Sequence, residues 1–275
     1  MVAIQPLTHL PAQENRLLRF NALESVDIHC HCLPGLDDGP GDMLGAVALC
    51  RALVEDGITA VIATPHQLGR YEGSNPPQEV RRVARLLEME LQRCEVPLQV
   101  KVGADVRLDE RLVELLANDQ ILTLADDGRY LLLELPHHTL IDPRPSIALL
   151  AKRGVRAILS HPERQARIAH DPDLVAPWVE SGMLLQLTAA SVIGDFGRAV
   201  QQAAWHLLKR GWVTLVATDA HDLDRRAPRM SAAIELIGAE LGHGLARRIC
   251  VENPARVWRG EDLPGQRLLS PARAG

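Results

Sequence analysis

Short apolar runs alternate with longer amphipathic stretches from residue 25 onward. The short runs are rich in Val, Ile and Leu and have the length of strands. They predict strands at Val26–His29, Ala60–Thr64, Leu98–Gly103, Tyr130–Glu134, Ala157–Ser160, Leu184–Leu187 and Val213–Thr218. The longer stretches predict helices at Asp42–Asp56, Gln78–Cys94, Pro145–Arg153, Asp173–Ser181 and Arg198–Lys209. Four of these helices are followed by glycine, where a helix C-terminal stop belongs: Gly57, Gly154, Gly182 and Gly211.

This alternation predicts an α/β fold in which parallel strands are covered by outer helices. Seven strand–helix units without a linker favour one closed or nearly closed (β/α) barrel over two domains. A doubly wound open sheet is the alternative that periodicity alone leaves open. We expect residues 1–24 to form an N-terminal extension, residues 25–260 the domain, and the Pro-, Gly- and Arg-rich residues 261–275 a loose tail.

Composition and charge exclude several classes of function. The chain has 275 residues, and its 47% hydrophobic and 24% charged residues are ordinary for a globular protein. A net charge of -5 without a basic cluster argues against nucleic acid as a partner. The longest apolar runs are too short to span a bilayer, so we expect no membrane insertion. The start of the chain lacks a signal-peptide pattern, and five cysteines suit a reducing cytoplasm, where we expect the protein.

The candidate chemistry begins at the end of the first predicted strand. His29 and His31 are two residues apart, so on a strand both side chains point to the same face, with Cys30 and Cys32 on the other. A Pro-Gly turn then brings Asp38 back beside the two imidazoles. This arrangement is typical of a metal site. Asp37 is expected to support the turn or a ligand.

Other predicted strands also end in metal-ligating residue types. His66, Asp105, Glu134 and His161 each follow or end a strand, and Asp219 and His221 follow the last one. In a parallel barrel all these strand ends meet on one face. Nine such side chains, counting His29, His31 and Asp38, predict a multinuclear centre suited to Mn, Fe or Zn.

A rival phosphatase signature lies near the C-terminus. Cys250 and Arg256 have the C-x5-R spacing of cysteine-dependent phosphatases. That chemistry needs a glycine-rich loop of backbone N–H groups around a thiolate. Here the intervening residues are Val-Glu-Asn-Pro-Ala, in which proline lacks a donor and glutamate repels phosphate. We therefore interpret this match as a coincidence.

The ordered motifs together resemble those of the polymerase-and-histidinol-phosphatase (PHP) superfamily. These motifs are His29-x-His31, Thr64-Pro65-His66, His161-Pro162-Glu163-Arg164 and Asp219-Ala220-His221. Residues 27–39 are similar to the opening of the bacterial manganese-dependent tyrosine phosphatases of capsule and exopolysaccharide operons (CpsB/YwqE type). Glu134-Leu135-Pro136, Leu187-Thr188-Ala189-Ala190-Ser191 and Asp222-Leu223-Asp224 match the same subfamily.

The resemblance implies a distorted seven-stranded (β/α) barrel, the PHP fold, which holds three divalent metal ions. Manganese is the expected metal, with Fe or Zn as other possibilities. One metal would be held by His29, His31, Asp105 and Asp219, a second by Asp105, Glu134 and His161, and the third by Asp38, His66 and His221. Arg164 and Arg226 match the family's phosphate-binding arginines, and guanidinium groups bind phosphoryl oxygens bidentately.

The implied activity is metal-dependent hydrolysis of phosphotyrosine on proteins. The implied substrate is a bacterial tyrosine kinase that controls polysaccharide synthesis. Two alternatives remain open at this point. One is a PHP phosphatase of a small phosphate ester such as histidinol phosphate. The other is a weakly active or inactive barrel that binds and regulates such a kinase.

Two positions depart from the subfamily pattern. Asp105 stands where glutamate is usual, and its side chain is shorter by one methylene, about 1.5 Å of reach. Bridging two metals from this position requires either an inward shift of the strand end or a change in metal spacing and occupancy. Arg225 stands where glycine is usual, and its charge beside Arg226 favours acidic phosphopeptides.

Overall fold

The computed structural model describes residues 25–137 and 139–263. The expected extension (1–24), His138 and residues 264–275 of the expected tail lie outside these ranges. The strands are β1 (Val26–Cys30), β2 (Ala60–Ala63), β3 (His66–Gln67), β4 (Gln99–Val102), β5 (Asp105–Arg107), β6 (Tyr130–Glu134), β7 (Arg156–Ser160), β8 (Leu184–Thr188) and β9 (Val213–Ala217). The longer helices are α1 (Met43–Glu55), α2 (Pro77–Arg93), α4 (Arg144–Ala151), α8 (Arg198–Lys209) and α9 (Met230–Leu241). Shorter helices are α3 (Leu112–Ala117), α5 (Ala166–His170), α6 (Ala176–Glu180), α7 (Ala189–Ile193), α10 (His243–Arg247) and α11 (Asn253–Trp258).

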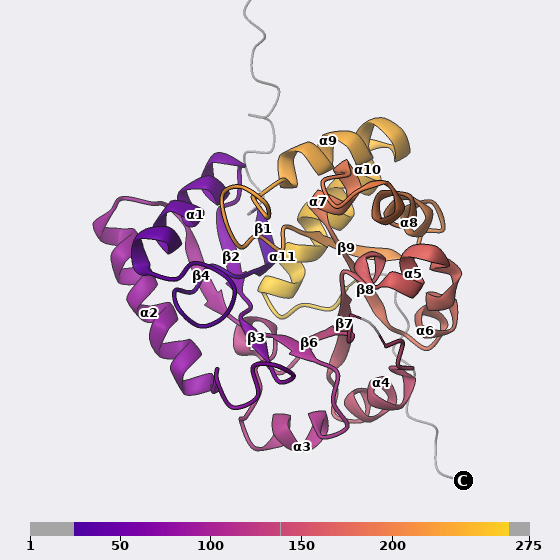
Figure 1. Cartoon of the computed structure of the whole chain (residues 1–275), viewed down its shortest axis with the longest axis horizontal. Helices are drawn as coiled ribbons and strands as arrows, with labels where there is room; N and C mark the ends of the chain where they lie inside the picture. Colours follow the sequence, from indigo (N-terminus) through magenta and orange to yellow (C-terminus); the bar gives the residue numbers. More distant parts are fainter. Residues whose placement is uncertain (1–24, 138, 264–275) are drawn as a thin grey trace, which may run out of the picture.

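The strands pair in parallel, as the alternation of strands and helices predicts. They form a three-stranded sheet of order β1-β2-β4 and a six-stranded sheet of order β3-β5-β6-β7-β8-β9. The six-stranded order follows the sequence without the reversal that defines a doubly wound sheet. The end of β1 also adjoins the segment after β9, because Cys30 and Ala220 form a parallel bridge. Helices surround the strands at the periphery (Figure 1).

The described ranges contain nine strands where the apolar pattern predicts seven. The run at Ala60–Thr64 ends at Ala63, and the chain pairs again as β3 from His66. The run at Leu98–Gly103 likewise ends at Val102 and resumes as β5 at Asp105. These continuations of two and three residues are too short and too polar for a strand pattern to reveal. They place His66 directly opposite Asp105 in register.

Most of the predicted helices form close to their predicted bounds. α8 spans Arg198–Lys209 as predicted, and α1 begins after Asp42, whose carboxylate accepts the N–H of Gly45 at 2.8 Å. The prediction of one helix at Asp173–Ser181 is wrong, since a 3-10 turn at Pro172–Val175 precedes α6. Prolines at the starts of both segments interrupt the ladder there. All four predicted stop glycines have φ between 70° and 94°.

The apolar pattern predicts no helix after Arg198–Lys209, yet α9, α10 and α11 follow β9. Asn253–Trp258 forms α11, which contacts β1 and β9. Val257 and Trp258 pack into a buried cluster with the inward-facing side chains of the strands. A pattern search misses this helix because it is short and begins with Asn-Pro. The cluster fills the space among the strands with Val26, Ile28, Ile62, Leu132, Ile158, Leu215 and Leu263.

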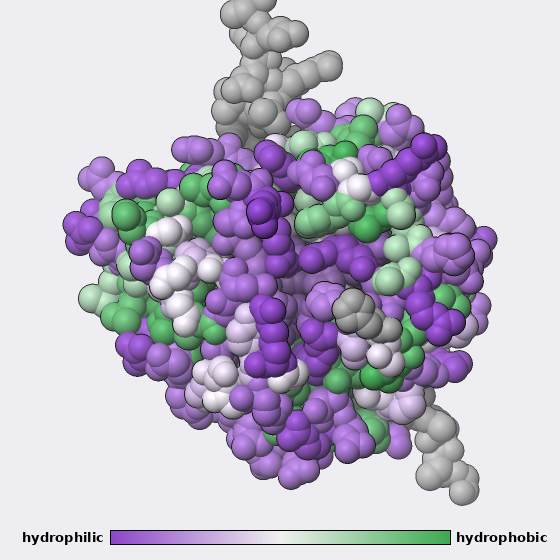
Figure 2. Space-filling view, viewed as in Figure 1, coloured by the Kyte–Doolittle hydropathy of each residue, from purple (hydrophilic) through white to green (hydrophobic). Residues whose placement is uncertain are grey.

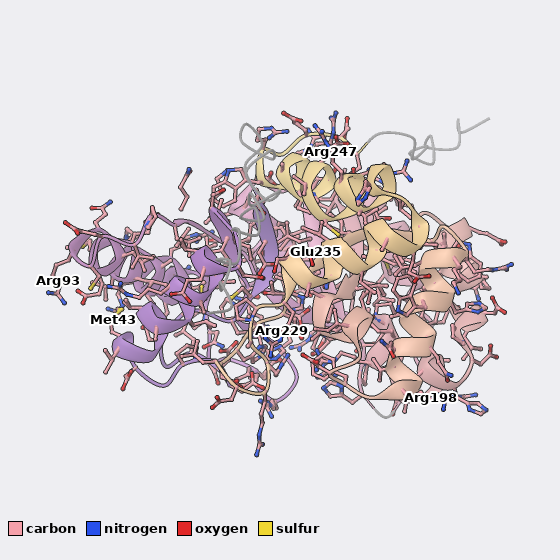
Figure 3. All side chains as sticks on the ribbon, turned by 90° about the horizontal axis from the view of Figure 1, so that it is seen from above. Met43, Arg93, Arg198, Arg229, Glu235 and Arg247 are labelled. Atoms are coloured by element: carbon pink, nitrogen blue, oxygen red, sulfur yellow. The ribbon has the colours of Figure 1, made fainter. Side chains whose placement is uncertain are left out.

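The carboxyl ends of the strands lie on the side of the molecule on which the helices begin. Met43 and Arg198 begin α1 and α8, and Arg229 precedes α9; all three lie toward one side in Figure 3, opposite Arg247 at the end of α10. Helices that follow parallel strands begin at the carboxyl ends of those strands. None of the helices in the described ranges combines the length and apolar character needed to cross a membrane.

Candidate metal centre

All nine predicted ligands meet at the carboxyl ends of the strands. Each lies in at least one of four overlapping groups whose ligand atoms are within 4.8 Å of one another. The groups are His31–Asp38–His66–His221, His29–Asp105–His161, His29–His31–Asp219 and His66–Asp105–Glu134. Hydrophilic residues surround a hollow near the centre of this face (Figure 2).

The hydrogen bonds of His29 and His31 fix which ring nitrogen is free. The Nδ1 of His29 donates to Oε1 of Gln186 at 2.8 Å, and that of His31 donates to Oδ2 of Asp37 at 2.6 Å. A neutral imidazole carries one ring proton, so both Nε2 atoms present lone pairs. These two Nε2 atoms lie 3.2 Å apart. Two lone pairs at this separation repel each other unless a cation lies beside them.

Three further buried atoms at this centre have no hydrogen-bond partner among the residues that the structure describes. They are Oδ2 of Asp105, Oδ1 of Asp219 and Nε2 of His221. The ring of His221 donates from Nδ1 to the carbonyl oxygen of Asp219 at 2.9 Å, so its Nε2 is also a lone-pair donor. Unsatisfied buried polar atoms are costly and rare. Several of them, all lone-pair donors of nitrogen or oxygen, fit bound Mn, Fe or Zn.

Burial keeps two of the imidazoles neutral, the form that binds metal. It lowers the pKa of His31 to about 3, with further lowering by His221. It lowers the pKa of His161 to about 4, with Arg164 as the next cause. Because metal ligands must be deprotonated, both rings are ready to bind at neutral pH. His161 and Asp219 also have left-handed backbones, with φ of 31° and 52°, which are uncommon for such residues.

Asp38 is the most accessible of the predicted ligands. Its side chain is 38% exposed, and Oδ1 lies 3.4 Å from Nε2 of His66 and 3.5 Å from Nε2 of His221. Partial burial alone would raise the pKa of Asp38, but the interactions with His221 and His66 outweigh it and lower the pKa. In His66 burial favours the neutral ring, yet Asp38 and Asp105 raise the pKa to about 9. A cation at this group would replace the proton shared by these side chains.

Asp37 supports the site, as its position in the turn predicts. Besides His31, its carboxylate accepts the backbone N–H groups of His66 and Gly39, both at 3.0 Å. Burial would raise the pKa of Asp37, but His31 lowers it to about 2. Asp37 therefore stays ionised and holds the ring of His31 in the metal-binding tautomer.

Asp105 lies at the junction of two groups despite its short side chain. Its Oδ2 is 3.5 Å from Nδ1 of His66 and 3.7 Å from the Nε2 atoms of both His29 and His161. The hydroxyl of Ser160 donates to its other oxygen at 3.0 Å. The carboxylate thus reaches the position from which it could bridge two cations.

Glu134 and His161 fall in different groups, although the family pattern expects them on the same metal. Oε2 of Glu134 lies 3.9 Å from Nδ1 of His66. The same oxygen pairs with the guanidinium of Arg107 at 2.9 Å, which holds the carboxylate on the side of His66. Burial, followed by the charge of Asp105, raises the pKa of Glu134 to about 7.

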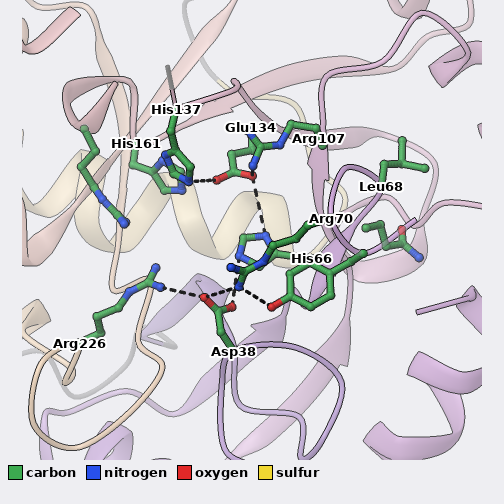
Figure 4. Close-up of a pocket in the computed structure, with 12 residues that line it drawn as sticks. Asp38, His66, Leu68, Arg70, Arg107, Glu134, His137, His161 and Arg226 are labelled. Carbon is green, nitrogen blue, oxygen red and sulfur yellow. Dashed lines mark hydrogen bonds and ion pairs between the residues drawn. The ribbon is translucent and has the colours of Figure 1, made fainter. Parts of the chain in front are cut away.

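The two predicted phosphate-binding arginines converge on one carboxylate. Arg226 donates to Oδ2 of Asp219 at 2.6 Å, and Arg164 pairs with the same oxygen. The guanidinium of Arg164 also lies 4.7 Å from the centre of the Phe196 ring. Both arginines line a cleft of about 100 Å³ beside the ligand groups (Figure 4).

Six residues that line this cleft are not among the predicted site residues: Gln67, Leu68, Arg70, Tyr71, Arg107 and His137. Arg107 is two positions after Asp105 on β5, so strand periodicity could have placed it on the same face. Arg70 and Tyr71 belong to a loop without a pattern. Arg70 pairs with Asp38 at 3.1 Å, and the ring of Tyr71 stacks on His66 with 5.4 Å between centroids.

The cysteines take no part in the ligand groups. Cys30 and Cys32 are fully buried, and Cys30 donates to the carbonyl oxygen of Ala220 at 3.5 Å. Cys250 is fully buried in a π-helical turn (Arg248–Glu252), and burial raises the pKa of its thiol. A protonated, inaccessible thiol cannot act as a nucleophile. The interpretation of the C-x5-R spacing as a coincidence agrees with this position.

Comparisons with known proteins give a consistent result. A family model described as "Capsular polysaccharide synthesis, CpsB/CapC" matches residues 25–259. The tyrosine-protein phosphatase YwqE of Bacillus subtilis is 35% identical over 242 residues, covering 86% of this chain and 93% of that protein. The tyrosine-protein phosphatase CpsB of Streptococcus pneumoniae is 26% identical over 240 residues, covering 84% and 97%.

Solved structures agree with these sequence matches. A chain from the crystal structures of B. subtilis YwqE and S. pneumoniae CpsB, described as unique metal-dependent tyrosine phosphatases, superposes with a TM-score of 0.83. It is 32% identical and covers 86% of this chain and 96% of its own. An organophosphorus hydrolase from Deinococcus radiodurans superposes at a TM-score of 0.56 with 16% identity over 86% and 93%, which indicates a shared fold alone.

Proposed function

Because the chain belongs to the CpsB/CapC family of capsular polysaccharide synthesis proteins, we propose that it is a metal-dependent phosphatase that hydrolyses phosphotyrosine in proteins. One observation carries the proposal. Nine nitrogen and carboxylate ligands, several with unsatisfied buried atoms, meet beside two arginines at one cleft. This combination matches the needs of phosphoryl transfer, which depends on positioning and on stabilising charge.

The four overlapping ligand groups support a centre of three divalent ions, with manganese as the expected metal. His29, His31, Asp38, His66, Asp105, Glu134, His161, Asp219 and His221 would hold them. Bound cations would supply Lewis acidity and acidify water, chemistry that phosphoester hydrolysis requires at neutral pH. Asp37 and Gln186 would keep the two rings of the His29–His31 pair oriented toward the metals.

Arg164 and Arg226 would bind the non-bridging oxygens of the phosphoryl group. Both now share Oδ2 of Asp219, so their guanidinium groups already point to the ligand cluster. Planar guanidinium groups donate two hydrogen bonds to a phosphoryl group and stabilise charge that develops in the transition state. A tyrosine leaving group has a pKa near 10 and needs less protonation than an alkyl alcohol.

The names of the relatives favour phosphotyrosine over histidinol phosphate, because the PHP ligand pattern alone does not separate these substrates. A complete ligand set disfavours an inactive regulatory barrel. We propose a bacterial tyrosine kinase of polysaccharide synthesis as the substrate and the cytoplasm as the location. Both proposals go beyond the names of the relatives, which say only that those proteins are tyrosine-protein phosphatases.

We also propose that the two sheets together form the distorted seven-stranded barrel of the PHP fold. Counting β2 with β3 and β4 with β5 as interrupted strands reduces the nine strands to seven. The bridge between Cys30 and Ala220 supports closure between β1 and β9. Two hydrogen bonds flank it, from Asp219 N to His29 O at 2.8 Å and from His31 N to Ala220 O at 2.9 Å.

The decisive experiment measures metal content and turnover on the same preparation. We expect EDTA to abolish hydrolysis of a phosphotyrosine peptide and Mn²⁺ to restore it, while alkylation of thiols has no effect. Histidinol phosphate should be a much poorer substrate. Full activity after complete removal of metal would refute the mechanism. Preferential hydrolysis of histidinol phosphate would refute the assigned substrate but retain the metal chemistry.

A further inference from the structure

A second pocket adjoins the cleft that Arg164 and Arg226 line, and it has a different chemical character. It has a volume of about 360 Å³, and residues at the start of α2 and at the end of α3 line it. Gln67, Leu68 and Tyr71 line both cavities, so this loop is the wall between them. Figure 4 shows Leu68 on the side of the cleft away from Arg226, so the second pocket leads away from the phosphate-binding arginines.

The wall is held rigidly in place. The amide of Gln67 donates to the carbonyl oxygen of Asn75 at 2.7 Å and accepts the N–H of Leu122 at 2.8 Å. The side chain of Asn75 donates to the carbonyl oxygen of His66 at 2.8 Å. These bonds link the wall directly to a predicted metal ligand. A preformed wall of this kind suits recognition of a ligand that passes over it.

The charges in the second pocket are already neutralised. Glu72 pairs with Arg111 at 3.2 Å, and Asp119 pairs with Arg81 at 2.8 Å. None of the residues that line it is a lysine or arginine. A phosphate or another anion therefore finds no lysine or arginine among the described residues that line this pocket, and the two arginines beside it are already paired with carboxylates. The pocket is chemically distinct from the cleft, which four arginines line.

Amide groups and apolar side chains make up the rest of the lining. The side chains of Gln78, Asn118 and Gln120 are exposed, and no hydrogen bond to another described residue is found for them. Pro77 is buried and Leu115 half-buried at the same pocket. Amides offer both donors and acceptors, which match the N–H and C=O groups of an extended polypeptide. Apolar surface beside them suits an uncharged side chain.

From these features we infer that the second pocket binds the polypeptide that flanks the phosphotyrosine of the substrate. The inference rests on the proposed function, and it names the substrate as an extended segment with an uncharged, apolar residue near the phosphotyrosine. Ligand sites typically enclose roughly 300–1,000 Å³, so the cleft of about 100 Å³ by itself falls below the usual size of a ligand site. The adjoining pocket provides the missing contact area on one side of Tyr71.

The test fills the pocket without touching the metal centre. Asn118→Trp introduces a large side chain at an exposed lining position at the end of α3. Glu114→Trp places the same side chain at an exposed position on the same helix outside the lining, and serves as the matched control. Each protein is loaded with Mn²⁺. The substrates are para-nitrophenyl phosphate, free phosphotyrosine and a phosphotyrosine peptide with an apolar flank.

We expect Asn118→Trp to lower kcat/KM for the peptide at least about tenfold, equivalent to about 1.4 kcal/mol, through a higher KM. Activity on the two small substrates should be unchanged, and Glu114→Trp should behave as the unmodified protein. An equal effect on peptide and small substrates, or no effect on either, would overturn the inference. If the unmodified protein hydrolyses none of the three, the proposed function itself fails.

Discussion

The single change Asp37→Asn tests whether the ring of His31 is held for metal binding by its neighbour. The carboxylate accepts three hydrogen bonds, from Nδ1 of His31 at 2.6 Å and from the N–H groups of His66 and Gly39 at 3.0 Å. Asparagine has almost the same shape, but one of its two terminal atoms is an NH₂ group that cannot accept. At least one of the three donors must therefore lose its partner.

Both orientations of the amide weaken metal binding. If the amide oxygen faces His31, the NH₂ group meets the N–H of Gly39, and a neutral group replaces the charge that makes the ring basic. If the NH₂ group faces His31, the ring proton moves to Nε2, the atom that lies 3.2 Å from Nε2 of His29. Loss of such a supporting partner typically costs about 10- to 100-fold in metal affinity, or roughly 1.4–2.7 kcal/mol.

The assay is competition for Mn²⁺ against a chelating dye, followed by turnover at saturating Mn²⁺. We expect Asp37→Asn to weaken Mn²⁺ binding within that range and to regain much of its turnover when Mn²⁺ is in excess. Asp42→Asn is the matched control, because Asp42 caps α1 and belongs to none of the ligand groups, and asparagine caps helices equally well. Unchanged Mn²⁺ affinity in a folded Asp37→Asn protein would refute the role assigned to this carboxylate.

Three further changes test other parts of the site. Arg226→Lys should lower kcat/KM for a phosphotyrosine peptide about a hundredfold while Mn²⁺ content, measured by mass spectrometry, stays constant, because lysine cannot donate bidentately. Asp105→Glu should change the number of bound Mn²⁺ ions per chain or the turnover, because the longer side chain moves the carboxylate oxygens relative to His29 and His161. Identical values for the two proteins would show that the bridging position tolerates either side-chain length. Burial raises the pKa of the Glu163 carboxyl from 4.5 to about 7, so between these pH values the folded state binds a proton that the unfolded state has lost. The stability that this group contributes below pH 4.5 is therefore lost as the pH rises through 7. Denaturant unfolding at pH 5 and 8 should therefore show Glu163→Gln gaining stability relative to the unmodified protein as the pH rises, and a constant difference would contradict this.

Much of the fold follows from the apolar pattern alone. Alternation predicted the parallel strands, and the stop glycines predicted the ends of several helices. The short strands β3 and β5 escaped because two or three residues are too few for a strand pattern to be recognised. α11 escaped because its burial depends on a cluster of side chains from six strands and the segment after α11, a tertiary contact that no local pattern encodes.

The candidate ligands could be named from their positions after strands, but their grouping could not. Sequence order does not reveal that Arg107 pairs with the oxygen of Glu134 that lies 3.9 Å from Nδ1 of His66. It also does not reveal that Arg70 pairs with Asp38 and that Tyr71 stacks on His66, because the position of this loop depends on these tertiary contacts. Distances between side chains on different strands arise only when the sheets form.

The interruptions in two strands explain how an aspartate can serve at position 105. β4 ends at Val102 and β5 begins at Asp105, and the break between them lets Asp105 pair directly opposite His66. In a continuous strand the side chains would alternate regularly between the two faces of the sheet, without the change that this break allows. The hydroxyl of Ser160 then fixes one carboxylate oxygen and leaves the other, fully buried and without a hydrogen-bond partner, among three imidazoles. The short side chain is thus compensated by the local backbone, which argues that the substitution is compatible with a working metal centre.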